Sequence, residues 1–312
     1  MAAILIYSEK NLLAEELLTA ARYLAGQTAV EVKAVCINNH EQAAQLADKG
    51  AAVYHIKNDN INLFDTVAVA SSLEQAARKL DVSIVLLASN RRGKELAGRL
   101  AQRLQAGCLT DVNGLTVVNG KIQCSRNALS GAVVATQQIE SAVKVIALAP
   151  RTFETAVTET GGNIQELNIA AAASLLKLVD SRSKAGDAVD IAAAEILVIV
   201  GQGVEAEGLE LAKRIAEALG GEIACSKPVA TDKKWLPEER IVGLSGKICK
   251  PQLAIILGVS GQVQFTVGIR DANTIVAINN DENAYILQMA DYAMIADLKQ
   301  VMPELAALLA GN

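Results

Sequence analysis

Short apolar segments alternate with longer amphipathic segments through the first 150 residues of the chain. The short segments have the length and β-branched content of buried strands, and they are Ala3–Ser8, Val30–Ile37, Ala52–Ile56 and Ser83–Ser89. The longer segments repeat apolar residues at helical spacing, and they are Asn11–Leu24, Glu41–Asp48, Phe64–Leu80 and Gly93–Gln105. Asn11 is expected to be the N-cap of the first helix. The alternation predicts an α/β layer with parallel strands.

The pattern changes after the fourth predicted helix. Leu115–Cys124 reads as an apolar hairpin with Asn119-Gly120 at its turn, a residue pair that type I′ turns prefer. Strand-like segments follow at Ala132–Gln138 and Val143–Ala149. The first domain is therefore predicted to carry an antiparallel extension.

A second strand-and-helix pattern begins after residues 151–186, which lose the periodicity and are expected to form a linker that lets the two domains reorient. The predicted strands are Glu195–Val200, Glu222–Ser226, Leu253–Leu257 and Thr274–Asn279, with a short apolar segment at Tyr292–Ala296. The predicted helices are Glu207–Leu219 and a last one from about Lys299 to Leu309. Long crossovers favour parallel pairing. We therefore expect two α/β domains, residues 1–186 and residues 187–312.

Composition narrows the function classes. Hydrophobic residues make up 51% of the chain but aromatic residues only 3%, which suits buried parallel strands covered by aliphatic helices. The scarcity of aromatic rings argues against a stacking platform for single-stranded nucleic acid. Residues 187–312 contain 10 Lys and Arg residues against 17 Asp and Glu residues, a net charge of −7. An acidic domain without a basic cluster predicts no nucleic-acid partner.

Hydropathy, the N-terminal sequence and the cysteine content indicate the expected cellular compartment. No stretch approaches about 18 consecutive apolar residues, so no membrane span is expected, and the N-terminus lacks the basic region of a signal peptide. The five cysteines form no Cys-x-x-Cys pair, and His40 and His55 are the only histidines in the sequence. Neither a disulfide framework nor a zinc site is therefore expected. The expected location is the cytoplasm.

A glycine-rich turn opens the second domain. Gly201-Gln202-Gly203-Val204-Glu205-Ala206 follows a predicted strand and precedes a predicted helix, which fits the loose dinucleotide pattern G-x-G-x-x-[G/A]. The acidic residue that usually binds the ribose after the second strand is missing, because that strand ends in Cys225-Ser226-Lys227. The turn therefore admits two interpretations, a pyrophosphate-binding turn and a plain tight turn.

Three further segments place small or hydrogen-bonding groups in the predicted loops. They are Gly243-Leu244-Ser245-Gly246-Lys247, Gly258-Val259-Ser260-Gly261 and Asn279-Asn280-Asp281. Open α/β sheets bind ligands at the carboxyl ends of their strands. Several such segments in one domain predict a ligand crevice there.

The second domain lacks the paired residues that nucleophilic catalysis requires. Both histidines lie in the first half of the chain, so no Ser–His or Cys–His pair can form within the second. Cys225 and Cys249 flank the predicted crevice and are expected to be buried structural thiols. Trp235, in a polar loop, is open to interpretation as a cap over a pocket, an interface residue or a loop anchor.

A long C-terminal segment now makes the chain recognisable. The segment PQLAIILGVSGQVQFTVGIRDANTIVAINNDENAYILQMADYAMIADL resembles the C-terminal signature of the electron transfer flavoprotein alpha subunit, which runs G-I-S-G-x-x-Q-H, I-V-A-I-N-x-D and A-D-Y-G. The upstream segments CSKPVA and GLSGKICKP match the family as well, and RGKELAGRLAQRLQAGCLTD resembles the N-terminal domain of its bacterial branch. The resemblance covers nearly the whole chain.

The resemblance implies a Rossmann-like C-terminal domain that binds FAD. It implies that Ser226 and Lys227 lie against the isoalloxazine and that Ser245 lies near flavin N5. Gln202, Ser260, Gly261 and Gln264 are implied at the ribityl-pyrophosphate portion. Asn279, Asp281 and Asp291 are implied to help hold the adenosine end or nearby backbone. The full set of implied cofactor-binding residues is Gln202, Ser226, Lys227, Leu244, Ser245, Gly246, Ser260, Gly261, Gln264, Phe265, Asn279, Asp281, Asp291 and Tyr292.

Two departures from the family pattern concern the flavin. Lys227 stands where the family has arginine, and Phe265 stands where it has histidine. Lysine is a point charge, whereas arginine has a planar fork that stacks on a ring, and the Phe265 side chain cannot donate a hydrogen bond. Both changes are expected to weaken the stabilisation of an anionic flavin.

The function implied by the resemblance is electron carriage rather than catalysis by the protein's own residues. With a beta subunit contacted by the first domain, the chain would shuttle electrons from dehydrogenases, of the acyl-CoA type, to an acceptor. Two alternatives remain at this stage. One is an NAD(P)-dependent oxidoreductase that uses the Gly201–Ala206 turn, and the other is a nucleotide-binding subunit that has lost its redox function.

Overall fold

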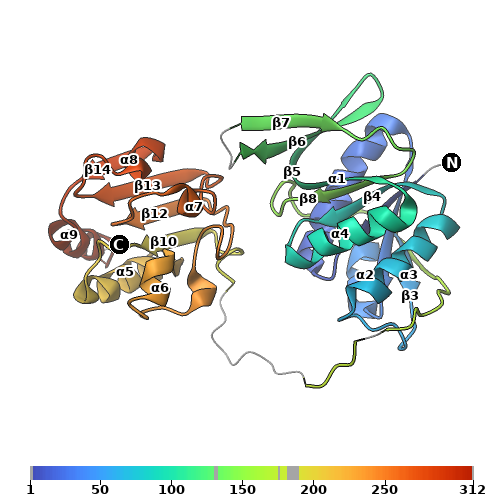
Figure 1. The fold of residues 1–312 in the computed structure, drawn as a ribbon, viewed down its shortest axis with the longest axis horizontal. Helices are drawn as coiled ribbons and strands as arrows, with labels where there is room; N and C mark the ends of the chain where they lie inside the picture. Colours follow the sequence, from blue (N-terminus) through green and yellow to red (C-terminus); the bar gives the residue numbers. More distant parts are fainter. Residues whose placement is uncertain (1–2, 130–132, 175, 181–189, 311–312) are drawn as a thin grey trace. The chain divides into compact units, whose positions relative to one another are not determined.

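The computed structural model describes residues 3–129, 133–174, 176–180 and 190–310. The chain divides into two compact units, residues 1–181 and residues 182–312, and each is described by itself (Figure 1). The predicted boundary between residues 186 and 187 lies outside the described residues. Among the described residues, no helix combines the length and the apolarity that a membrane crossing needs.

The first unit is built on a mixed sheet. Its strands are β1 (Ala3–Tyr7), β2 (Glu31–Ile37), β3 (Ala52–Ile56), β4 (Val82–Ala88), β5 (Gly107–Val118), β6 (Lys121–Ala128), β7 (Val133–Gln138), β8 (Lys144–Leu148) and β9 (Asn163–Glu166). Within the described residues they form one nine-stranded sheet in the order β7-β6-β5-β8-β4-β1-β2-β3-β9. The pairs β5–β6 and β6–β7 are antiparallel and the others are parallel. The predicted α/β layer with an antiparallel extension is confirmed.

Helices cover both faces of this sheet. They are α1 (Asn11–Thr28), α2 (His40–Asp48), α3 (Thr66–Lys79) and α4 (Arg91–Leu104). Alternate residues of a strand point to opposite faces. Ile4 and Ile6 accordingly pack with apolar residues of α1 and α2, whereas Leu5 packs with those of α3 and α4. The near-continuous apolar runs in the sequence reflect this burial on two faces.

The N-cap of the first helix differs from the prediction. The N-cap of α1 is Lys10, not Asn11, and its side chain makes no cap hydrogen bond. The Asn11 amide donates instead to Gln45 on α2, over 2.6 Å. Asn11 is thus the first residue of the helix and its side chain joins α1 to α2.

The polar segment before the second unit also differs from the prediction. Residues 151–186 were expected to be linker, but strand β9 lies within them and pairs in parallel with β3. Beyond β9, Ile169 is 5% exposed in the core of the first unit, and the Ser174 hydroxyl donates to Asp65 over 2.6 Å. All four residues of β9 are exposed, which explains why its sequence carries no apolar pattern.

The second unit is a parallel sheet of five strands among the described residues. They are β10 (Ile196–Val200), β11 (Glu222–Cys225), β12 (Leu253–Leu257), β13 (Thr274–Asn279) and β14 (Tyr292–Ile295), in the order β11-β10-β12-β13-β14. The helices are α5 (Ala206–Ala218), α6 (Lys227–Thr231), α7 (Val263–Thr266), α8 (Tyr285–Met289) and α9 (Leu298–Ala310). Apolar residues of α5, α6 and α9 pack on one face of the sheet, and those of α7 and α8 on the other. The predicted parallel strands are confirmed.

Two glycine turns meet at the carboxyl edge of this sheet. The N–H of Gly201 donates to the Leu257 carbonyl over 2.8 Å, and the N–H of Gly203 donates to the Gly258 carbonyl over 3.0 Å. A Cβ on Gly201 would lie 2.2 Å from the Gly258 oxygen. Only a glycine allows the turn after β10 to approach the turn after β12 this closely.

Replacing Gly201 by alanine should therefore destabilise the second unit by about 1–3 kcal/mol, because the added methyl group overlaps backbone that cannot move aside. Urea unfolding followed by Trp235 fluorescence measures this, since Trp235 is the only tryptophan in the sequence. Gly98→Ala is the control, because a Cβ there meets nothing within 4 Å and Gly98 lies in the other unit. Equal urea midpoints for Gly201→Ala and the unmodified chain would contradict the close approach.

Candidate functional site

The strand ends of the second unit bring most of the predicted site residues to one edge. Gln202 follows β10, Ser226 and Lys227 follow β11, Ser260 follows β12, and Asn279 ends β13. Because all five strands are parallel, their carboxyl ends lie at the same edge of the sheet. Gln202, Lys227 and Ser260 are exposed there, so their polar groups are accessible to a ligand.

A lysine that the sequence analysis did not single out holds the glycine-rich turn in place. Lys233 Nζ donates to the carbonyl oxygens of Gln202, over 2.9 Å, and Val204, over 2.8 Å. The same ammonium lies 4.1 Å from the centre of the Trp235 ring, close enough for a cation–π interaction. Trp235 therefore acts here as the platform that orients Lys233. No local pattern marks this, because the contact joins residues about thirty positions apart.

Ser226 stands at the junction of β11 and α6. It is buried, and its N–H donates to the Val200 carbonyl over 3.0 Å. Ser226 is also the N-cap of α6, but its hydroxyl does not cap the helix. Lys227 begins the helix and is exposed. The backbone bond thus fixes Ser226 beside the end of β10, and the exposed Lys227 follows it.

The Gly243–Gly246 loop rests on α7. The N–H of Leu244 donates to the Gln264 carbonyl over 2.8 Å. Gly243 has φ +128°, and a Cβ there would lie 2.4 Å from the Gln264 oxygen, so this position requires glycine. Leu244, Ser245 and Gly246 are exposed, as is Gln264. The close packing therefore brings the loop that contains Ser245 against α7.

The turn after β12 is pressed against α8. Gly261 has φ +84°, and a Cβ there would lie 2.4 Å from the Ile286 nitrogen. The N–H of Ile286 donates to the Ser260 carbonyl over 3.3 Å. Backbone contacts with α8 therefore fix the turn. The Ser260 side chain takes no part in them and is exposed.

Asn279 links the end of β13 to the turn after β12. Its side-chain amide donates to the Val259 carbonyl over 2.8 Å, and its oxygen accepts the N–H of Asp281 over 3.0 Å. Asn279 is 7% exposed. Its amide group is thus already engaged in tying the turn after β12 to the end of β13.

Three of the predicted residues lie away from these exposed groups. Asp291 and Tyr292 are at the amino end of β14, the opposite edge of the sheet, where the Asp291 carboxylate accepts the Ile275 N–H over 2.8 Å. Phe265 is on α7 but is 7% exposed and packs in the apolar core with Ile269. The structure does not bring these side chains together with the groups at the carboxyl edge.

The chemistry available at this edge is binding rather than nucleophilic attack. Burial raises the pKa of the Cys225 thiol to about 12, with Arg240 opposing the shift, so the thiol is protonated at neutral pH. His40 and His55 both lie in the first unit. No group of described His, Cys, Asp and Glu residues is arranged to hold a metal ion. The groups left to bind a ligand at this edge are hydroxyl, amide, backbone N–H and ammonium donors.

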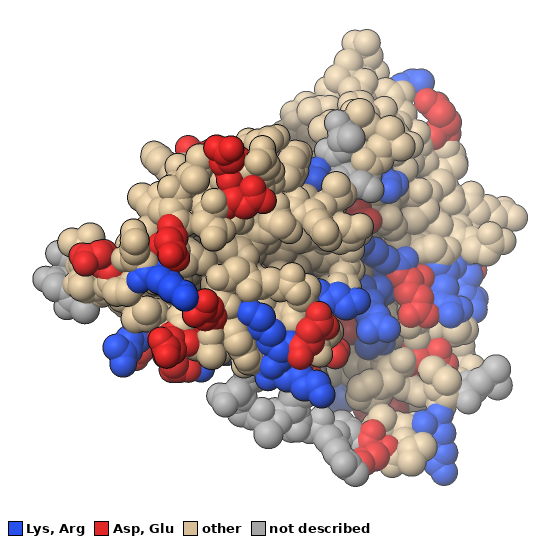
Figure 2. Space-filling view, turned by 60° about the vertical axis from the view of Figure 1, so that its left-hand side comes forward, with Lys and Arg blue, Asp and Glu red and all other residues tan. Residues whose placement is uncertain are grey.

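These donors suit a long, polar cofactor that carries a pyrophosphate. The exposed neutral groups Gln202, Ser245 and Ser260 come from three separate turns and Gln264 from α7, and Lys227 adds one positive charge. On the face drawn in Figure 2, Lys and Arg side chains are interspersed with Asp and Glu side chains. Binding at the edge therefore depends on local donors, because neutral amides and glycine turns can hold a pyrophosphate without a basic surface.

Comparisons with known proteins give the family. Residues 8–172 match the model of the electron transfer flavoprotein domain, and residues 190–270 match the model of the electron transfer flavoprotein FAD-binding domain. A solved structure of MurG from Acinetobacter baumannii aligns over 100% of this chain and 90% of its own, but with a TM-score of 0.35 and 13% identity.

Curated relatives extend the match over both units. Protein FixB of Escherichia coli O157:H7 is 32% identical over 311 residues, which is 98% of this chain and 97% of the relative. FixB proteins of Shigella flexneri and of Escherichia coli strain K12 / DH10B match with the same identity and coverage. The chain belongs to the electron transfer flavoprotein family, as an alpha subunit whose second domain binds FAD.

Proposed function

We propose that FAD lies along the carboxyl edge of the second unit's sheet and that the chain, with a beta subunit, carries electrons from dehydrogenases to an acceptor. The observation that carries this proposal is the set of exposed donors on separate turns, each turn anchored by backbone contacts that require glycine or by Lys233. An anchored set of donors holds a cofactor without paying the entropy of ordering the loops on binding.

We assign each group the role that the family resemblance implies. Ser226 and Lys227, at the end of β11, lie against the isoalloxazine, and Ser245 lies near flavin N5. Gln202 and the turn after β12 with Ser260 and Gly261, together with Gln264, contact the ribityl-pyrophosphate portion. Leu244 and Gly246 flank Ser245 in the same exposed loop.

The adenosine end is assigned to the end of β13. Asn279 and Asp281 lie there, and the exposed Asp281 carboxylate is free to turn its second oxygen to a ribose hydroxyl, since one oxygen accepts the Asn283 N–H. Asp291, Tyr292 and Phe265 are proposed to act indirectly, by supporting β13 and α7, because their side chains lie elsewhere.

The chemistry itself belongs to the cofactor, since bound FAD supplies the redox step. The protein's residues bind the flavin, orient its ring and set the charge around it. No described residue is needed as a nucleophile or a general base, which is consistent with a carrier. The carrier role has two alternatives. One is an NAD(P)-dependent oxidoreductase, and the other is a nucleotide-binding subunit without redox function.

The partners proposed for this carrier are a beta subunit and dehydrogenases of the acyl-CoA type, in the cytoplasm. The first unit offers a surface for the beta subunit at β7, the edge strand of its sheet. Val133 and Val134 on this strand are 47% and 66% exposed, and Leu129 before it is 78% exposed. Exposed apolar residues on an edge strand are typical of a protein interface.

Purification of the chain with its beta subunit tests the carrier role. The expected result is a yellow complex with flavin absorption bands, which an acyl-CoA dehydrogenase and its substrate bleach under anaerobic conditions. A colourless complex with affinity for a nicotinamide nucleotide would favour the oxidoreductase. A complex that holds FAD but accepts electrons from no dehydrogenase would favour the subunit without redox function.

Replacing Lys233 by methionine should weaken FAD binding by about tenfold, because the two hydrogen bonds that fix the Gly201–Val204 turn are lost. Fluorescence titration of FAD into the apo complex measures the dissociation constant. Lys213→Met is the matched control, since Lys213 is an exposed residue of α5 that pairs with Glu210. Equal dissociation constants for the two variants would remove Lys233 from the site.

Replacing Lys227 by arginine should raise the midpoint potential of the bound flavin, by up to about 30 mV, equivalent to about 1.4 kcal/mol for two electrons. Arginine stacks on the ring and keeps its charge in a planar group, which stabilises negative charge on the reduced flavin more than lysine does. Lys227→Met should lower the potential. Spectroelectrochemical titration measures both, with Lys213→Arg as the control, and unchanged potentials would place Lys227 away from the ring.

A further inference from the structure

The first unit contains a cavity that the flavin site does not use. It has a volume of about 330 Å³ and lies between residues 7–10, after β1, and residues 87–96, at the end of β4 and the start of α4. This volume is within the range of small-molecule sites, roughly 300–1,000 Å³. All of its lining residues belong to the first unit.

The cavity occupies the point of the sheet where the chain changes direction. β1 pairs with β2 on one side and with β4 on the other. The connection after β1 leads toward β2, and the chain later returns to β4 on the far side. In open α/β sheets the crevice at such a switch point, outside the carboxyl ends of the strands, is where ligands bind.

The first turn of α4 is fixed at the mouth of this cavity. A Cβ on Gly93 would lie 1.8 Å from the Ala88 oxygen, so only glycine lets the helix begin so close to the end of β4. The Asn90 side-chain oxygen accepts a hydrogen bond from the N–H of Gly93 over 2.7 Å, and the Asn90 carbonyl accepts one from the N–H of Lys94 over 3.0 Å. The N–H groups of Arg91 and Arg92 are thereby left for a ligand.

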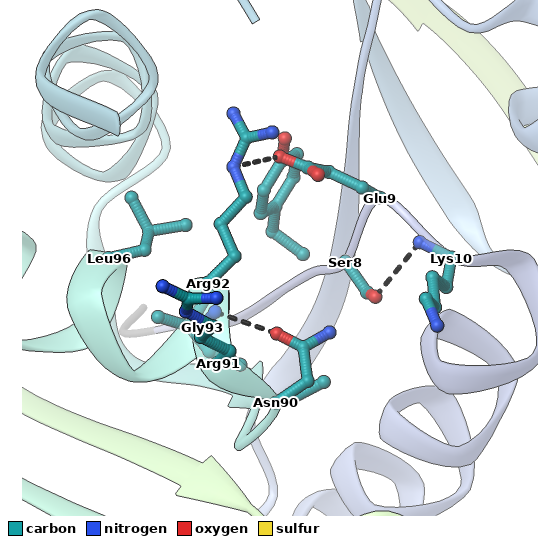
Figure 3. Close-up of a pocket in the computed structure, with 11 residues that line it drawn as sticks. Ser8, Glu9, Lys10, Asn90, Arg91, Arg92, Gly93 and Leu96 are labelled. Atoms are coloured by element: carbon teal, nitrogen blue, oxygen red, sulfur yellow. Dashed lines mark hydrogen bonds and ion pairs between the residues drawn. The ribbon is translucent and has the colours of Figure 1, made fainter. Parts of the chain in front are cut away.

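The charged groups at the cavity are mostly positive. Lys10, Arg91 and Arg92 line it together with one carboxylate, Glu9. Figure 3 shows Arg92 turned toward Glu9, and its Nε lies 3.0 Å from Glu9 Oε1. Arg91 forms no ion pair with any described residue. Among the charged lining residues, cations thus outnumber carboxylates by three to one.

Arg92 also has a polar atom without a partner. Its Nη2 is buried, and no described residue accepts a hydrogen bond from it. A buried donor that is left unpaired costs about 1–3 kcal/mol, so such atoms call for an acceptor. A bound anion that reaches the Arg92 guanidinium would supply one.

The wall of the cavity is apolar. Leu87 is 1% exposed, Leu96 is 3% exposed and Tyr7 is 5% exposed, and all three line it. The lining thus joins an apolar wall, suited to a ring, to positive charge at a helix N-terminus, suited to a phosphate. Glu9 provides a carboxylate oxygen for a sugar hydroxyl, the role acidic residues have in nucleotide sites.

We propose that this cavity binds a nucleoside phosphate, with its phosphate at the first turn of α4 and its base against Leu87 and Leu96. The site is separate from FAD binding, since every residue of it lies in the first unit. It goes beyond the proposed carrier function and does not depend on it.

Calorimetric titration of ADP into the full chain, saturated with FAD together with its beta subunit, tests the proposal. Saturating FAD blocks the nucleotide-binding edge of the second unit. ADP should bind, adenosine should bind more weakly because it lacks the phosphate, and inorganic phosphate should bind more weakly because it lacks the base. Arg91→Ala and Arg92→Ala should each weaken ADP binding at least about fivefold.

Arg99→Ala is the matched control, because Arg99 lies on the same helix, carries the same charge and pairs with Glu95 on the exposed face. Its ADP affinity should equal that of the unmodified chain. The flavin absorption spectrum, measured on every variant, shows that the protein is folded and holds FAD. The proposal is overturned if ADP does not bind, if phosphate binds as tightly as ADP, or if Arg91→Ala and Arg92→Ala bind ADP as Arg99→Ala does. A failure with normal flavin spectra leaves the carrier function intact.

Discussion

Burial of both sheet faces is the constraint on which the rest of this structure depends. Strands such as β1, β4 and β12 carry apolar residues toward helices on each side, so they leave little room for polar side chains along their length. Polar and charged groups must then stand where the strands end. In parallel sheets these ends lie together, so the packing requirement itself gathers the groups that can bind a ligand.

The two units apply this constraint to different chemistry. The second unit presents neutral donors and one exposed lysine at its carboxyl edge, as a long cofactor requires. The first unit places arginines around an apolar cavity at its switch point. In both, a glycine permits a close backbone approach. Gly201 lets the turn after β10 contact the turn after β12 at Gly258, and Gly93 lets α4 begin close to Ala88 at the end of β4. These glycines thus determine the positions of the polar groups around them.

Much of the fold followed from the sequence, because the responsible interactions are local or periodic. Apolar segments predicted β3, β12 and β13 with their observed bounds, and Asn119-Gly120 marked a hairpin whose two turn residues have positive φ. Motif resemblance identified the family, and the alternation of strands and helices predicted the carboxyl edge as a binding region. Strand β9 was missed because its side chains are exposed on both faces and leave no pattern to read.

Only the tertiary structure decided which of those residues stand together. The motif A-D-Y contributes Asp291, but the direction of β14 places it at the opposite edge, bound to the Ile275 N–H. Lys233 became part of the site through contacts with residues about thirty positions away. By itself the sequence determined the elements, the family and the cofactor. Contacts between distant segments decided the geometry, because strand order and helix docking bring together residues whose spacing along the chain carries no signal.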